Sequence, residues 1–156
     1  MGASEDVLAE TIARYRDTHP QQSGGHIARL RQHLETQLDE VIDDYPVEQW
    51  MLVQDPGDAH VRAATTAGQF DKLLTGDHGL LQDRDREPPV PYEPISPDDF
   101  FMVVYDSSQE LVDEVLVSQV SYFLKRDGEA DVPRHAKAAG CPRFAKVLGE
   151  LMRRRM

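Results

Sequence analysis

The sequence predicts an all-α protein, a single compact domain of six to seven helices packed around one central helix. Apolar residues recur at helical spacing through most of the chain, and Ser, Asp, Gly and Pro mark the ends of those segments. One segment, at about 108–126, is much more apolar than the rest. A length of 156 residues with a hydrophobic content of 40% suits one globular domain over 1–156.

The central helix is predicted within the most apolar stretch of the chain, Ser96 to Gly128. Ser107 or Ser108 begins it, and Ser107 with Glu110 matches a capping box, in which two side chains satisfy free N–H groups of the first turn. Its apolar positions form one stripe of Val112, Leu116, Val120 and Phe123, flanked by Leu111, Val115, Val117, Tyr122 and Leu124. We therefore expect a buried core helix.

Two helices are predicted before the centre of the chain. The first begins at Ser4 and ends before Pro20, because the residue before a proline avoids the helical conformation. The second runs from about Gly24 to Asp44, with apolar residues at helical spacing. Its acidic residues crowd its C-terminal end, where the helix dipole disfavours negative charge.

The middle of the chain leaves one alternative open. Apolar runs at 47–54 and 100–105 are too short for periodicity to separate helix from strand. Short helices are preferred at both places. The alternative is an α+β fold with short strands at Trp50–Val53 and Met102–Tyr105.

The rest of the sequence contains further signals for the start of a helix. Asp55 followed by Pro56 predicts a helix that ends at Gly76, and Ser96 followed by Pro97 predicts one that breaks around Asp106. A proline-rich extended connection is expected at 77–95. The C-terminal end, 132–156, is predicted as two helices, Val132–Ala139 and Pro142 to about Arg154.

Acidic and basic residues are unevenly distributed along the chain. The formal net charge is −11, yet 132–156 holds seven basic residues and one acidic residue, which leaves the first 131 residues at −17. The basic residues that could contact nucleic acid phosphates lie on the last predicted helix: Arg143, Lys146, Arg153, Arg154 and Arg155. This basic C-terminal end carries the alternative function, a nucleic-acid-binding regulator.

An acidic surface is the leading candidate for partner binding. Five carboxylates lie at the end of the second predicted helix, against the preference of the helix dipole: Glu35, Asp39, Glu40, Asp43 and Asp44. A local rule broken this consistently often marks a functional surface. We expect the partner to be another protein with a basic surface.

No catalytic, cofactor or metal motif is recognisable. The sequence lacks a phosphate-binding glycine loop, HExxH, GxSxG and CxxC. The only cysteine, Cys141, precedes a helix start near Arg143 and Lys146, which could favour its thiolate, or it could simply fill a tight turn. We assign no catalytic residue, no metal ligand and no cofactor; an enzyme, for instance a small metal-dependent one, is the less favoured class.

The leading interpretation is a non-enzymatic protein-binding module: an adaptor, inhibitor or regulatory subunit. The acidic N-terminus does not resemble a signal peptide, and no apolar run is long enough to cross a membrane. A cytoplasmic location without membrane contact is therefore expected.

Overall fold

The computed structural model describes residues 1–52 and 55–155. The chain divides into two compact units: an N-terminal unit of Met1–Leu73 with Gln82–Glu93, and a C-terminal unit of Leu74–Leu81 with Pro94–Met156. Helices dominate, with eight α-helices and two short two-stranded sheets in the described residues, which confirms the predicted helical fold class. The expectation of one domain over 1–156 stays a prediction.

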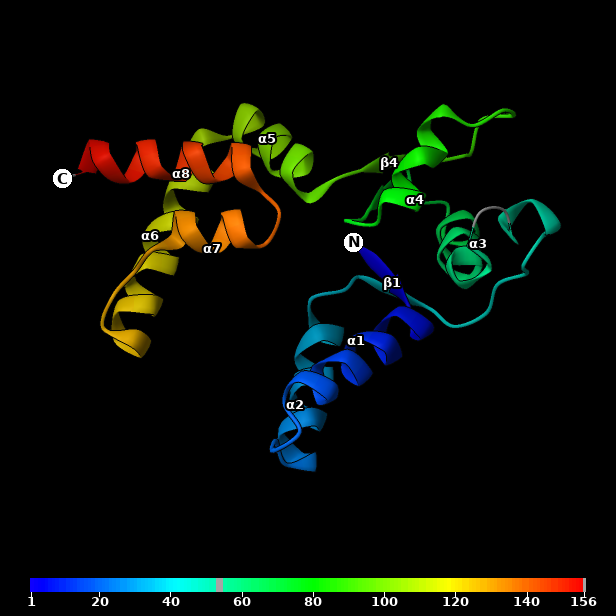
Figure 1. Ribbon diagram of the computed structural model, residues 1–156, viewed down its shortest axis with the longest axis horizontal. Coiled ribbons are helices and arrows are strands. Elements are labelled where there is room, and N and C mark those ends of the chain that lie inside the picture. The colour runs from blue at the N-terminus through cyan, green and yellow to red at the C-terminus, as the bar shows by residue number, and fades with distance from the viewer. Residues whose placement is uncertain (53–54, 156) are drawn as a thin grey trace. The chain divides into compact units, whose positions relative to one another are not determined.

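The N-terminal unit combines three α-helices with a small parallel sheet. Figure 1 labels the three helices and β1, the first strand of that sheet. In chain order it contains β1 (Gly2–Ser4), α1 (Glu5–Thr18), α2 (Gly24–Thr36), β2 (Glu40–Ile42), 3-10 turns at Gln49–Leu52 and Pro56–Asp58, α3 (Ala59–Ala67) and a 3-10 turn at Gln82–Asp85. The strands β3 (Lys72–Leu74) and β4 (Glu93–Ile95) pair with each other where the chain passes between the units.

The helices α1 and α2 form an antiparallel hairpin, as Figure 1 shows. Ser4 caps α1 as predicted, with its hydroxyl accepting from the Val7 N–H at 3.1 Å. The hydroxyl of Tyr15 lies 3.1 Å from Nε2 of His26. At the other end of the hairpin, Arg31 pairs with Glu5.

The second helix is shorter than predicted, because it ends at Thr36 rather than at Asp44. The hydroxyl of Thr36 donates to the carbonyl oxygen of His33 at 2.7 Å, within the last turn of the helix. The chain then extends into β2, which pairs in parallel with β1, so that Ile42 aligns with Ser4 and is buried. Ending the helix early also keeps Asp39, Glu40, Asp43 and Asp44 out of its last turn, whereas Glu35 remains there.

A buried ion pair organises the rest of the N-terminal unit. The side chain of Arg62 in α3 is completely buried and donates from Nε to Oδ2 of Asp83 at 2.8 Å. A second nitrogen, Nη1, donates to the carbonyl oxygen of Met51 at 3.1 Å, and the Tyr92 hydroxyl donates to Asp83 at 3.0 Å. Burial of the Tyr92 ring is the main reason that its pKa is raised. Three segments distant in sequence are thereby joined.

Trp50–Leu52 belong to a 3-10 turn, which agrees with the preferred short helix at 47–54 and not with the alternative strand, while Val53 lies outside the described residues. Two further expectations for the middle of the chain need correction. The helix after Asp55 ends at Ala67 rather than at Gly76, because Gln69 adopts a left-handed conformation and the chain turns into β3. The connection at 77–95 is not simply extended, since it contains α4 (His78–Leu81), a 3-10 turn and β4.

The C-terminal unit contains the predicted central helix. Its four longer segments are α5 (Pro97–Ser107), α6 (Gln109–Asp127), α7 (Val132–Ala138) and α8 (Pro142–Arg155). Met102–Tyr105 are therefore helical rather than a strand. Helix α6 begins after Ser108, whose hydroxyl accepts from the Leu111 N–H; Ser107 instead donates to the Val103 carbonyl oxygen, so the predicted Ser107–Glu110 capping box is wrong.

The core of the C-terminal unit lies between α6 and α8. Val112 and Leu116 of α6 pack against Leu148 and Leu151 of α8, and all four are buried. Figure 1 shows α7 alongside α8 and running in the opposite direction. Helix α6 ends at Gly128, which adopts a left-handed conformation (φ 77°) suited to glycine.

Candidate interaction surface

One side of α6 is apolar but exposed. Leu111, Val115 and Tyr122 lie along it, and about half of the surface of each residue is accessible (50%, 50% and 51%). The exposed Ser118 lies between them, and we refer to these four residues as the α6 strip. Because a helix that is apolar all round is normally buried, this strip lacks the cover that its sequence implies.

An apolar groove of about 460 Å³ lies beside the strip, bounded by α5, α6, α7 and α8. Leu111 and Val115 of the strip form part of its wall. Phe101 and Phe144 also line the groove, and their rings stack with their centroids 4.9 Å apart. Pockets of this size accept a small ligand or a few protruding side chains.

Charged residues flank the strip only at the two ends of α6. Ten consecutive residues from Val115 to Leu124 are uncharged. Glu110 and Glu114 precede this segment, whereas Lys125 follows it, and all three are exposed. The helix therefore has an acidic first part, an uncharged middle and a basic residue near its end.

Arg126 is held against the last aromatic residues of α6. Its guanidinium lies 5.1 Å from the ring centroid of Tyr122 and 5.0 Å from that of Phe123. It also donates two hydrogen bonds to the Asp127 carboxylate, at 2.8 and 2.7 Å. These contacts fix Arg126 within its own helix.

The single cysteine lines the apolar groove. Cys141 is buried, and burial raises the pKa of its thiol, with the nearby Asp98 carboxylate raising it further. This direction opposes the activation by Arg143 and Lys146 that the sequence left open. Cys141 has the surroundings of a structural cysteine that fills a turn.

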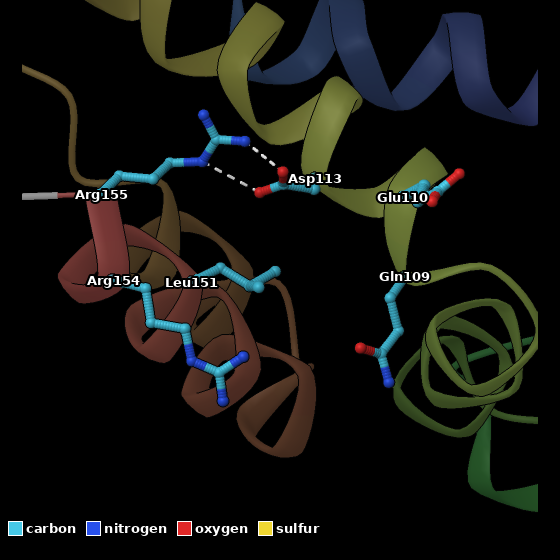
Figure 2. A pocket seen from close by; sticks show the side chains of 6 residues that line it. All are labelled: Gln109, Glu110, Asp113, Leu151, Arg154 and Arg155. Carbon is cyan, nitrogen blue, oxygen red and sulfur yellow. Dashed lines mark hydrogen bonds and ion pairs between the residues drawn. The ribbon is translucent and has the colours of Figure 1, made fainter.

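A second, polar cleft of about 330 Å³ separates the start of α6 from the end of α8. Figure 2 shows two hydrogen bonds that close one end of it, between Arg155 and Asp113. Leu151 forms part of its lining, along with Gln109, Glu110 and Arg154. The main feature of this cleft is an ion pair that links α8 to α6.

The five predicted acidic site residues lie together in the sequence but in different surroundings. Glu35 is in the last turn of α2 and pairs with Arg31 at 2.7 Å. Asp39 pairs with the amino group of Met1, which lowers the pKa of its carboxyl. Glu40, Asp43 and Asp44 lie in or after β2 and are exposed, so the acidic segment is a strand and loop rather than a helix end.

The predicted basic residues all lie on α8, and two of them are paired. Arg143 pairs with Asp99 and Arg155 with Asp113. Lys146, Arg153 and Arg154 have no carboxylate within ion-pair distance among the described residues. Of the five predicted basic residues, these three are available to an external anion without breaking an ion pair within 1–52 and 55–155.

Neither a metal-binding cluster nor a membrane-spanning helix is found in the described residues. Across 1–52 and 55–155, no three His, Cys, Asp or Glu side chains are placed to share a metal ion. No helix in that same part of the chain has the length and apolar character needed to cross a bilayer. No known protein family, curated protein or solved structure was found to match the chain.

The α6 strip was missed as a site by sequence reasoning, although a signal for it exists. The segment 115–124 is uncharged, and its apolar residues surround the helix almost completely. Such a helix predicts burial on all sides. Only the structure shows that the neighbouring helices cover Val112 and Leu116 and leave the flanking residues exposed.

Proposed function

We propose that the protein is a non-enzymatic protein-binding module, an adaptor, inhibitor or regulatory subunit, and that it binds through the α6 strip and the adjoining groove. The observation that carries this proposal is the half-exposed apolar surface of Leu111, Val115 and Tyr122 beside an apolar groove. Exposed apolar patches of this kind are typical of protein interaction sites.

The partner element that fits is an amphipathic helix with basic residues beside its apolar stripe. Helices commonly bind in apolar grooves through residues spaced at i, i+4 and i+7. The net charge of −11, with exposed Glu110 and Glu114 at the start of α6, favours a positively charged partner. The acidic segment Glu40, Asp43 and Asp44 would add long-range attraction.

A synthetic amphipathic peptide of leucine and lysine, labelled with a fluorophore, tests this proposal. We expect fluorescence anisotropy to report saturable binding to the intact chain and its loss in Val115→Asp. Val47→Asp is the matched control, because Val47 is equally exposed, at 50%, but lies in the N-terminal unit. Equal binding by the two variants would refute the assignment of the surface.

Nucleic-acid binding is the second candidate function. It is favoured by Lys146, Arg153 and Arg154, the cations of α8 without a carboxylate partner among the described residues. Glu150 on the same helix and the acidic composition of the chain count against it.

A cytoplasmic location completes the proposal and agrees with a single, buried, unpaired cysteine.

A further inference from the structure

The α6 strip has the spacing of a helix-pairing seam. Leu111, Val115, Ser118, Tyr122 and Lys125 follow one another at intervals of four, three, four and three residues. This is the interval pattern of the contact positions in coiled coils. All five residues are exposed, and the guanidinium of Arg126 in the same helix lies against one of them, Tyr122.

The charges on this side of α6 would complement those of a second α6 helix that runs in the opposite direction. Glu114 borders the seam beside Val115, one turn after Leu111, and Lys125 is its last residue. Eleven residues separate them, or about three helical turns and 16 Å along the axis, so they lie on one side of the helix but cannot pair within it. In an antiparallel pair of α6 helices, Glu114 of each copy would lie next to Lys125 of the other copy.

We propose that the occupant of the α6 strip is a second copy of this chain, bound through antiparallel α6 helices in a symmetric dimer. In the register that unites the charges, Ser118 faces Tyr122 of the second copy, and the small residue leaves room for the large ring. Val115 then faces Lys125, whose aliphatic stem covers the valine while its amine reaches Glu114. Two-fold symmetry repeats every contact.

This inference rests on the proposed function, because it names the partner of the same surface. The basic residue beside the partner's apolar stripe is then Lys125 of the second copy, and its attraction to Glu114 is local, since two copies of net charge −11 repel each other at long range. Sedimentation of the intact chain, at about 0.15 M salt to screen the repulsion between acidic copies, should give a concentration-dependent species of twice 17.6 kDa. Val115→Asp should remove it, whereas Val47→Asp should not.

Charge reversal tests the antiparallel register. Glu114→Lys and Lys125→Glu should each weaken the dimer by about tenfold, since two symmetric attractions become repulsions. The double variant Glu114→Lys/Lys125→Glu should restore it, because the opposite charges meet again. Glu150→Lys on α8 changes the net charge by the same amount as Glu114→Lys and should leave the dimer intact.

The outcomes separate this inference from the proposed function. A monomeric wild type that still binds the leucine–lysine peptide through Val115 overturns the second copy and leaves the protein-binding proposal standing. A monomer that binds no peptide overturns both. A dimer that is insensitive to Val115→Asp, or that the double charge reversal fails to restore, overturns the antiparallel α6 contact.

Discussion

The carboxylate of Asp98 in α5 accepts a hydrogen bond from the backbone N–H of Phe144 in α8 at 2.9 Å. Its second oxygen accepts from the N–H of Arg143 at 3.2 Å. Asp98 thus caps a helix that begins more than forty residues later, and it does so while buried. Two N–H groups of the first turn of α8 are satisfied by a negative charge at the positive end of its dipole.

Replacing Asp98 should therefore destabilise the C-terminal unit. We expect Asp98→Ala to lower the free energy of unfolding by about 1–2 kcal/mol, the usual effect of losing a helix cap. Urea denaturation followed by circular dichroism measures this change. Asp106→Ala is the control: Asp106 is exposed at the other end of α5, so its loss should leave stability unchanged. Equal stability of the two variants would contradict the capping role.

The buried pair of Arg62 and Asp83 makes the second prediction. Asp83→Leu should lower the free energy of unfolding by about 3–5 kcal/mol, because it leaves the arginine charge buried without its partner. Arg62→Met/Asp83→Leu should recover much of that loss by replacing both charges with apolar groups. Denaturant titration of the single and double variants checks this. A double variant that is no more stable than Asp83→Leu would contradict the cost assigned to the unpaired arginine charge.

The third prediction compares buried and exposed positions on α6. Leu116→Asp should unfold the C-terminal unit, because Leu116 is only 2% exposed and an unpaired buried carboxylate costs several kcal/mol of a total stability of about 5–15 kcal/mol. Val120→Asp, on the partly buried side of the same helix, should also be destabilising. Val115→Asp should remain folded, since Val115 is half exposed. Thermal melting of the three variants separates the buried and exposed sides of α6.

Local signals in the sequence predicted most helix starts correctly. Ser4, Ser96 and Ser108 each accept a hydrogen bond from an N–H in the helix that follows. These caps depend on residues within one turn and can be read directly. The end of α2 could not be predicted, because it depends on the pairing of Ile42 in β2 with the distant Ser4 in β1.

The apolar residues of the interaction surface could be recognised in the sequence, but their exposure could not be predicted from it. The apolar character of 115–124 was evident, but periodicity cannot show which of several apolar sides will be covered. Coverage depends on where α8 packs, and α8 contacts α6 through Leu148 and Leu151. The cap from Asp98 was hidden for the same reason, since its position in the first turn of α5 suggested a role in that helix alone.

The fourth prediction concerns the acidic segment after α2. Changing Asp39, Glu40, Asp43 and Asp44 to Asn or Gln should not raise the melting temperature, because these residues lie beyond the end of α2 and no dipole clash is relieved. The same variant should associate more slowly with the leucine–lysine peptide and show a weaker salt dependence. Stopped-flow association at several salt concentrations measures both. An unchanged rate would mean that the acidic segment is only solvated.

The last prediction separates the two candidate functions through α8. Lys146→Ala/Arg153→Ala/Arg154→Ala should fold normally, since none of these residues has an ion-pair partner among those described; Arg155→Ala should be less stable, because it strips Asp113 of its partner. If the three free cations bind nucleic acid, the wild type binds duplex DNA with a salt slope of about 0.9 per phosphate contact, and the triple variant loses most of that slope. We expect no such binding, because Glu150 interrupts the basic side of α8 and the whole chain carries −11. Electrophoretic mobility shift at low and high salt checks this, and salt-dependent binding that disappears in the triple variant would make nucleic acid the preferred partner.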